Sequence, residues 1–424
     1  MTVNIKEVDT LVVGAGQAGI AMSEHLTRQG VPHLVLEKNR IAEAWRTNRW
    51  DSLVANGPAW HDRFPSMEFS DVDQDCFVPK DQVADYFNDY VKKFELPVIS
   101  GIEVSNVEKN KEGSGFIVQT SDGVFHAQHI VSATGPFQSP VIPSIATEDH
   151  GIHQMHSADY RNPEALPEGA VLVIGAGSSG VQIADELLQS GKTVYLSVGP
   201  HDRPPRSYRG RDFVWWLGVL GLWDVPANEP GKEHVTIAVS GAEGGKTIDF
   251  RQLAERGMKL VGRTQSFNQS TVLFSNDLAD NIRAGDDNYL SLLDRADAYI
   301  ADNGLDLPEE PEARELLPDS HCMTNPTIEL DMKAAGIQSI IWATGYSTDY
   351  SWLNVDAFDD NNQPKHHRGV SKQTGVYFLG LPWLSRRGSS FIWGVWHDAK
   401  YIADQIVIQR QYKQYKQYTS PAAK

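Results

Sequence analysis

The chain has 424 residues, of which 41% are hydrophobic and 22% are charged, and its formal net charge is −17. This length suffices for about two or three hydrophobic cores, and the composition is that of an ordinary globular protein. The negative charge argues against a nucleic acid or an anionic membrane surface as a partner.

The N-terminal segment and the cysteines bear on location and redox chemistry. Residues 1–9 are polar and charged, so we expect no secretory signal peptide. Cys76 and Cys322 are the two cysteines, and they form no Cys-x-x-Cys motif, which disfavours a redox-active disulfide. We predict a cytoplasmic protein that acts on a small molecule and has no integral membrane segment. A homo-oligomer remains among the alternatives.

A glycine-rich loop follows the first predicted strand, Thr10–Val13. The loop reads Gly14-Ala15-Gly16-Gln17-Ala18-Gly19, and residues 20–29 are predicted to form a helix. Glycines in such a strand-loop-helix allow a tight turn and the close approach of a pyrophosphate, whose charge the helix N-terminus stabilises. The next strand, residues 32–36, ends in Glu37, where a carboxylate accepts hydrogen bonds from a ribose diol. This pattern is typical of FAD and NAD sites.

Two apolar runs end in the same three small residues. Ala133-Thr134-Gly135 follows a strand that begins at Ile130, and Ala343-Thr344-Gly345 follows one that begins at Ile340. Small residues at such a point let the chain cross between domains next to a bound nucleotide. Both runs therefore support a flavoprotein.

A second glycine loop lies about 160 residues after the first. It reads Gly175-Ala176-Gly177-Ser178-Ser179-Gly180 and follows the apolar run Val171–Ile174. The next strand ends in Ser197 instead of an acid, and Arg203 and Arg206 follow. A carboxylate would repel a 2′-phosphate, whereas guanidinium groups would bind it. The second loop is therefore predicted to bind NADPH rather than NADH, although at least one of these arginines could be an ordinary surface residue.

The longest apolar window runs from Phe213 to Trp223. It is too short to cross a bilayer, which needs about 20 residues. Three interpretations remain open: a packed helix or domain contact, the lining of a substrate passage, or peripheral membrane docking.

The order of these elements predicts an interrupted first domain. Residues 375–380 form a predicted strand and a loop that ends in Gly380, and a helix is expected over residues 398–409. We predict an α/β fold with two Rossmann-like dinucleotide-binding domains, the NADPH domain inserted into the FAD domain. The expected bounds are 1–163 and 322–412 for the FAD domain, 164–321 for the NADPH domain, and 413–424 for a disordered tail.

Taken together, these motifs resemble the flavin-containing monooxygenases, which belong to the class B flavoprotein monooxygenases. Ala44-Trp45-Arg46 and Arg49-Trp50-Asp51 are similar to the family's segment after the ribose-binding acid, and Asn56-Gly57-Pro58 to its Asn-Gly-Pro. The segment His156–Tyr160 matches the second half of the family fingerprint, whereas the first half departs from it at residues 150–152. Baeyer–Villiger members carry Trp where this chain has Tyr160, so the resemblance favours oxygenation of a heteroatom.

The resemblance implies a chemistry that the residues alone do not show. NADPH would reduce FAD, and the reduced flavin would form a C4a-(hydro)peroxide that oxygenates a small substrate at nitrogen or sulfur. The alternatives are oxygenation of a ketone and a reductase or dehydrogenase without a stable peroxide. The implied catalytic residue is Asn56, whose alternative role is to cap a turn. Lys38, Trp45 and Arg46 would join the glycine loops in binding cofactors.

The histidines are assigned less directly. His61 and His397 are candidate pocket residues, with ordinary hydrogen-bonded histidines as the alternative for both. His156 is expected to link the domains. A metal site at His366-His367 is not expected, because no His or Cys cluster has ligand spacing.

Overall fold

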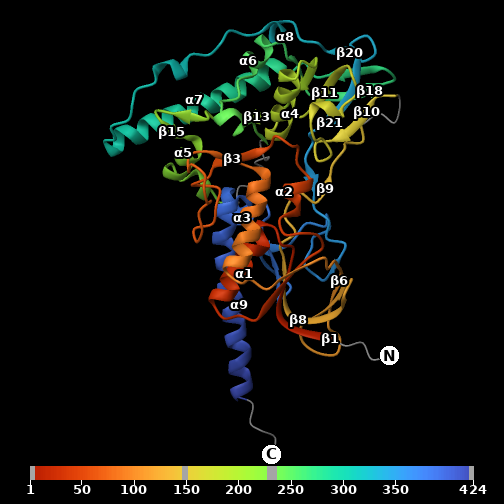
Figure 1. Cartoon of the computed structure of the whole chain (residues 1–424), viewed down its shortest axis with the longest axis vertical. Helices are drawn as coiled ribbons and strands as arrows, with labels where there is room; N and C mark the ends of the chain where they lie inside the picture. Colours follow the sequence, from red (N-terminus) through yellow and green to blue (C-terminus); the bar gives the residue numbers. More distant parts are fainter. Residues whose placement is uncertain (1–4, 146–150, 227–235, 420–424) are drawn as a thin grey trace, which may run out of the picture.

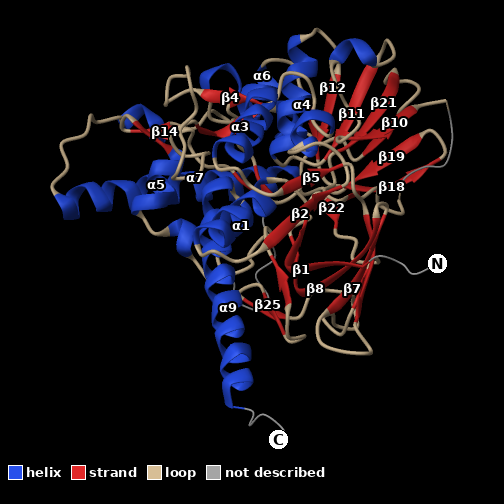
Figure 2. Cartoon of the chain, turned by 60° about the horizontal axis from the view of Figure 1, so that its bottom comes forward, coloured by secondary structure: helices blue, strands red, loops and turns tan. Residues whose placement is uncertain are grey.

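Two β-sheets, one mixed and one wholly parallel, are flanked by helices and form the two halves of the molecule (Figure 1). The structure is a computed structural model that describes residues 5–145, 151–226 and 236–419. Figure 2 shows the second sheet, with β10, β11, β12 and β21, above the first sheet, with β1, β7 and β8.

The first sheet has five parallel strands at its centre, in the order β5-β2-β1-β8-β26. Their bounds are Val98–Ser100, His33–Glu37, Ile5–Val13, Gly123–Ser132 and Val376–Phe378. The first half of β8 also pairs with β7 (Phe116–Thr120), which continues into β6 (Val104–Lys109) and β23 (Leu353–Asn354). Helix α1 (Gln17–Arg28) packs against α9 (Ile392–Thr419) and α3 (Lys80–Lys93). Residues from both ends of the chain therefore build one domain.

The second sheet is also parallel, in the order β10-β21-β11-β12-β17. Its strands are His153–His156, Ile337–Trp342, Ala170–Ile174, Val194–Ser197 and Lys259–Val261. Strand β11 is buried along its whole length, as expected for a β-branched strand covered on both faces. Helices α4 (Ser178–Gln189), α6 (Phe250–Glu255) and α7 (Leu278–Asn303) belong to this half, as does the antiparallel group β18 (Thr264–Asn268), β19 (Thr271–Phe274) and β20 (Glu329–Asp331). The predicted α/β fold with two Rossmann-like domains is confirmed.

The boundaries of the inserted domain differ from the predicted ones. Strand β10 lies before residue 164 and β21 lies after residue 321, yet both pair within the second sheet. The chain returns to the first domain only after Trp342, beyond the position expected near Cys322. The physical reason is that β21 is the strand that covers one edge of β11, and the second sheet is incomplete without it. The two crossing segments, β9 (Ser139–Pro140) and β22 (Tyr346–Ser347), pair with each other.

The C-terminal helix is longer than predicted. The helix expected over residues 398–409 lies inside α9, which continues to Thr419, so the expected disordered tail is helical at residues 413–419. Val395, Ile402 and Ile406 are buried in the core shared with α1, which anchors the start of α9. The end of α9 extends away from the domains (Figure 1). Residues 420–424 lie outside the described residues.

The apolar window Phe213–Trp223 is a packed element. It forms α5 (Phe213–Val219) and the short helix Leu222–Asp224, and Phe213, Leu217 and Trp223 are buried in one cluster. The packing interpretation is confirmed. In the described part of the chain, no helix is long and apolar enough to span a membrane.

Candidate functional site

The first glycine loop turns directly against the end of β8. Gly14 has φ +104°, and a Cβ there would lie 2.8 Å from the carbonyl oxygen of Ala133. A Cβ on Gly19 would lie 1.8 Å from the carbonyl oxygen of Gly14. Both positions therefore require glycine. Gly16 differs, because a Cβ there would meet no atom within 4 Å, which leaves open the space that a pyrophosphate needs.

Other predicted residues of the first site converge on this loop. The Glu37 carboxylate accepts hydrogen bonds from the backbone N–H groups of Ala15 and Asn39, both at 2.8 Å. A Cβ on Gly380, after β26, would lie 2.8 Å from Cβ of Ala18. Gln17 donates to the carbonyl oxygen of Ser390 at 2.7 Å. The return of the chain thus closes over the start of α1.

The remaining predicted residues of this site lie around it. Gln138 donates to the hydroxyl of Thr134 at 2.9 Å and to the carbonyl oxygen of Gly135 at 2.7 Å. Helix α2 (Glu43–Thr47), which carries Trp45, begins where Ala42 N–H donates to the carbonyl oxygen of Ala15. The Arg46 guanidinium is paired with Asp85 at 2.7 Å, and Lys38 is exposed. These two cations are therefore peripheral in this structure.

The second glycine loop repeats the same turn. Gly175 has φ +108°, and a Cβ there would lie 2.4 Å from the carbonyl oxygen of Ala343. A Cβ on Gly180 would lie 1.8 Å from the carbonyl oxygen of Gly175. Ala343-Thr344-Gly345 thus packs against the second glycine loop in the same way as Ala133-Thr134-Gly135 packs against the first. Thr344 donates to the carbonyl oxygen of Val141 at 2.5 Å, which ties this strand end to the crossing segment.

A segment of the chain covers the second glycine loop at Gly177, whereas the first glycine loop is open at Gly16. We call residues Thr236–Ser240 the covering segment. Cγ2 of Thr236 lies 2.3 Å from the position of a Cβ on Gly177, and Ser178 donates to the carbonyl oxygen of Ile237 at 2.7 Å. The space equivalent to the open one at Gly16 is therefore filled by the chain itself. Ser179, the next residue of α4, is partly exposed.

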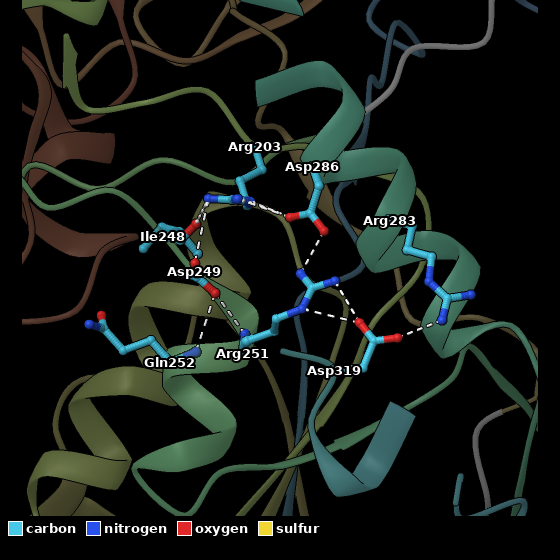
Figure 3. Close-up of polar contacts among 8 residues, drawn as sticks. All are labelled: Arg203, Ile248, Asp249, Arg251, Gln252, Arg283, Asp286 and Asp319. Atoms are coloured by element: carbon cyan, nitrogen blue, oxygen red, sulfur yellow. Dashed lines mark hydrogen bonds and ion pairs between the residues drawn. The ribbon is translucent and has the colours of Figure 1, made fainter. Parts of the chain in front are cut away.

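Arg203 points into the second domain (Figure 3). Its guanidinium pairs with Asp286 of α7 at 2.9 Å, and the same carboxylate pairs with Arg251 at 2.5 Å. Arg251 and Arg283 also pair with Asp319, and these two guanidinium groups, Arg283 first, hold the pKa of Asp319 below its usual value. The network neutralises a buried cation, so the structure does not support the expectation that Arg203 binds a 2′-phosphate.

Arg206 is also committed to a carboxylate. It forms a two-pronged ion pair with Asp212, at 2.6 Å and 2.8 Å, and its guanidinium lies 4.7 Å from the ring centre of Phe77. A further N–H donates to the carbonyl oxygen of Asn56 at 2.6 Å. Ser197 is buried and donates to the carbonyl oxygen of Gly262 at 3.0 Å. The structure therefore brings neither Arg206 nor Ser197 to a free surface at the end of β12.

Asn56 lies where the two domains meet. It belongs to β3 (Val54–Pro58), which pairs with β4 (Phe77–Pro79), and its Oδ1 accepts a hydrogen bond from Gln182 of α4 at 2.9 Å. The sequence interpretation missed Gln182. The available signal was one amide in the apolar run after the second glycine loop, Val181-Gln182-Ile183-Ala184.

The three candidate histidines lie in different environments. His61 Nδ1 pairs with Asp62 at 2.8 Å, and its ring stacks on Trp223 at 5.3 Å between centres. His397 lies against Trp393. His156 contacts the carbonyl oxygen of Gly345 at 2.9 Å, as expected of a linker, and burial lowers the pKa of its ring.

Tyr160 is tied to the second domain, and His366 and His367 are not part of a metal site among the described residues. Tyr160 donates to Glu186 at 2.6 Å, and burial raises the pKa of its hydroxyl. The described residues contain no cluster of His, Cys, Asp and Glu that could hold a metal, including around His366 and His367.

Comparison with known sequences places the chain among oxidoreductases. A family model described as pyridine nucleotide-disulphide oxidoreductase matches residues 11–209. A protein of Geobacillus kaustophilus (strain HTA426), described as an uncharacterized oxidoreductase CzcO-like, is 36% identical over 405 residues, covering 94% of this chain and 98% of that protein. The probable indole-3-pyruvate monooxygenase YUCCA4 of Arabidopsis thaliana is 25% identical over 413 residues, covering 94% of this chain and 90% of its own.

Solved structures share the fold. A flavin-containing monooxygenase from Stenotrophomonas maltophilia has a TM-score of 0.67 at 20% identity, covering 96% of this chain and 99% of that one. A complex of OTEMO with FAD and NADP has a TM-score of 0.58 at 14% identity, covering 96% of this chain and 86% of that one. The resemblance to flavin-containing monooxygenases is confirmed.

The ion-pair network of Arg203 generates a stability prediction. Asp286→Asn leaves two buried guanidinium groups without their shared carboxylate, which should cost about 3–5 kcal/mol and lower the thermal unfolding midpoint by about 10 °C. Asp122→Asn is the control, because its ion pair with Lys6 is exposed and should contribute little. Differential scanning calorimetry measures both. If Arg203→Ala changed coenzyme preference without lowering the midpoint, Arg203 would be a coenzyme ligand after all.

Proposed function

The chain belongs to the family of CzcO-like oxidoreductases, and we propose that it uses FAD and NADPH to transfer one oxygen atom from dioxygen to a small organic substrate, at nitrogen or sulfur. The observation that carries the proposal is one glycine-loop geometry that is repeated next to the parallel strands of two β-sheets. Two dinucleotide sites on one chain suit hydride transfer between two cofactors. Both cysteines are free thiols, which favours oxygenation over the chemistry of a disulphide reductase.

The residues of the first loop fit FAD. The open space at Gly16 and the N-terminus of α1 would take the pyrophosphate, and the Glu37 carboxylate would receive the ribose hydroxyls. When bound, the flavin would accept a hydride and react with dioxygen, and the protein would orient it and exclude water. Asn56 would contribute a hydrogen-bond donor, since its Oδ1 is already occupied by Gln182.

The backbone of the second glycine loop fits a dinucleotide, but the covering segment occupies the space that the dinucleotide needs. The methyl group of Thr236 fills the space at Gly177, so a pyrophosphate would bind there only after the covering segment moved. NADPH preference requires a cation other than Arg203 and Arg206. Arg263 is the candidate, because it follows β17 beside the end of β12, its side chain is 66% exposed, and its ion pair with Asp277 is long at 3.8 Å.

Flavin binding is tested at Gly16. Gly16→Val should fold normally, because its φ of −81° suits any residue and its Cβ has free space, but the side chain would occupy the pyrophosphate position. We expect loss of bound FAD, measured from the absorption spectrum of the purified protein. Gly218→Val is the control, because its Cβ also has free space but lies outside both loops. Equal flavin content in both variants would contradict the assignment.

Coenzyme choice is tested at Arg263. Arg263→Ala should reduce the NADPH/NADH ratio of kcat/KM by about ten- to a hundredfold, the range expected when a charge-assisted contact to a phosphate is lost. The control is Arg283→Ala, which removes another exposed arginine of the same domain. An unchanged ratio in Arg263→Ala would place the 2′-phosphate elsewhere or exclude it.

The reaction itself is tested by its stoichiometry. With NADPH and an amine or sulfide substrate, we expect one dioxygen consumed and one N- or S-oxide formed for each NADPH oxidised. Asn56→Ala and Asn56→Asp should divert electrons to hydrogen peroxide, because both remove the amide donor. Substrate oxidation without dioxygen would identify a dehydrogenase. Ester formation from ketones would identify the Baeyer–Villiger alternative.

A further inference from the structure

We propose that Gln182 is a positioning residue that determines which end of the Asn56 amide faces the reaction site. This inference rests on the proposed function, in which Asn56 donates a hydrogen bond beside the flavin. Gln182 lies on α4, the helix that begins at the second glycine loop, and only 8% of its surface is exposed. Because α4 belongs to the second domain and Asn56 to the first, the two residues lie in different domains.

Gln182 uses both hydrogens of its amide nitrogen. Nε2 donates to the carbonyl oxygen of Val239 at 2.7 Å and to Oδ1 of Asn56 at 2.9 Å. Val239 belongs to the covering segment, whose Ile237 carbonyl also accepts the hydroxyl hydrogen of Ser178. A buried amide held at two points in this way loses its freedom to rotate.

The orientation of the Gln182 amide follows from its contact with the backbone carbonyl oxygen of Val239. A backbone carbonyl oxygen only accepts hydrogen bonds, so the group that Gln182 presents to Val239 must be its nitrogen. If the Gln182 amide were reversed, two acceptor oxygens would meet at 2.7 Å. The second hydrogen of Nε2 then requires an acceptor, and Asn56 must present Oδ1.

The consequence is that Nδ2 of Asn56 faces away from Gln182. Among the described residues, Nδ2 donates to no protein acceptor, which leaves it as a donor for a ligand. The backbone of Asn56 cannot swing to compensate, because Arg206 donates to its carbonyl oxygen at 2.6 Å and is itself bound by Asp212. The hydrogen bonds from Gln182 to Val239 and to Asn56 thus determine which end of the Asn56 amide faces away from the second domain.

Gln182→Glu should reverse the orientation of the Asn56 amide without changing the shape of the side chain at position 182. In its protonated form, the carboxyl oxygen that replaces Nε2 would donate its hydrogen to the carbonyl oxygen of Val239 and accept a hydrogen bond from Asn56. In its ionised form, the same group could only accept hydrogen bonds. In either state Asn56 would turn Nδ2 toward position 182 and present Oδ1 to the reaction site.

The experiment compares variants of the flavin-loaded protein. Gln182→Glu should raise the ratio of hydrogen peroxide to product by about tenfold or more, because the hydrogen bond from Nδ2 of Asn56 to the reaction site is lost. Gln182→Met, which frees the amide without reversing it, should give a smaller effect. Gln189→Glu is the matched control, since Gln189 lies at the exposed end of the same helix.

Two readouts separate positioning from a general structural effect. In an Asn56→Ala background, Gln182→Glu should leave the ratio of hydrogen peroxide to product unchanged, because Gln182 affects that ratio only through Asn56. The side-chain amide signals of Asn56 in 15N NMR, assigned by their loss in Asn56→Asp, should move in Gln182→Glu and stay in place in Gln189→Glu. The NMR result is independent of turnover, so it tests the inference even if the protein proves to be no oxygenase. Equal effects in both backgrounds, or unmoved Asn56 signals, would overturn it.

Discussion

Close backbone contact between each glycine loop and a neighbouring strand end is the constraint on which the rest of the structure depends. The Cβ position of Gly14 lies 2.8 Å from the carbonyl oxygen of Ala133, and that of Gly175 lies 2.4 Å from the carbonyl oxygen of Ala343. No side chain fits in either place. Each sheet therefore packs its Ala-Thr-Gly strand end directly against its glycine loop. Because β21, which leads into the second Ala-Thr-Gly, belongs to the second sheet, the chain returns to the first domain only after it.

The two loops share a backbone but differ in what lies above them. Gly16 faces open space, whereas Gly177 faces the methyl group of Thr236. The covering segment that carries Thr236 also carries Val239, the acceptor that orients Gln182. The cover of the second loop and the orientation of Asn56 are thus parts of one contact between the domains. Movement of the covering segment would act on both.

The burial of Arg203 and Arg206 explains why their positions in the sequence did not identify the site of a 2′-phosphate. Arg203, Arg206 and Arg251 are each at most 4% exposed, and each is paired with aspartate. A guanidinium taken out of water must be matched by a carboxylate, otherwise the unfavourable desolvation remains uncompensated. The chain has 55 acidic residues to supply such partners. An arginine after a strand is therefore as compatible with an internal ion pair as with a phosphate.

The sequence by itself determined what depends on neighbouring residues. Both glycine loops, the strands that enter them and Glu37 at the end of β2 follow from local patterns, because turn geometry and strand burial are encoded within a few residues. Only the tertiary structure decided the domain boundary at Trp342, the inward direction of Arg203 and Arg206, and the cover over Gly177. It also decided the hydrogen bond between Gln182 and Asn56, which are 126 residues apart. A contact of that range depends on how two domains pack, and no local pattern records it.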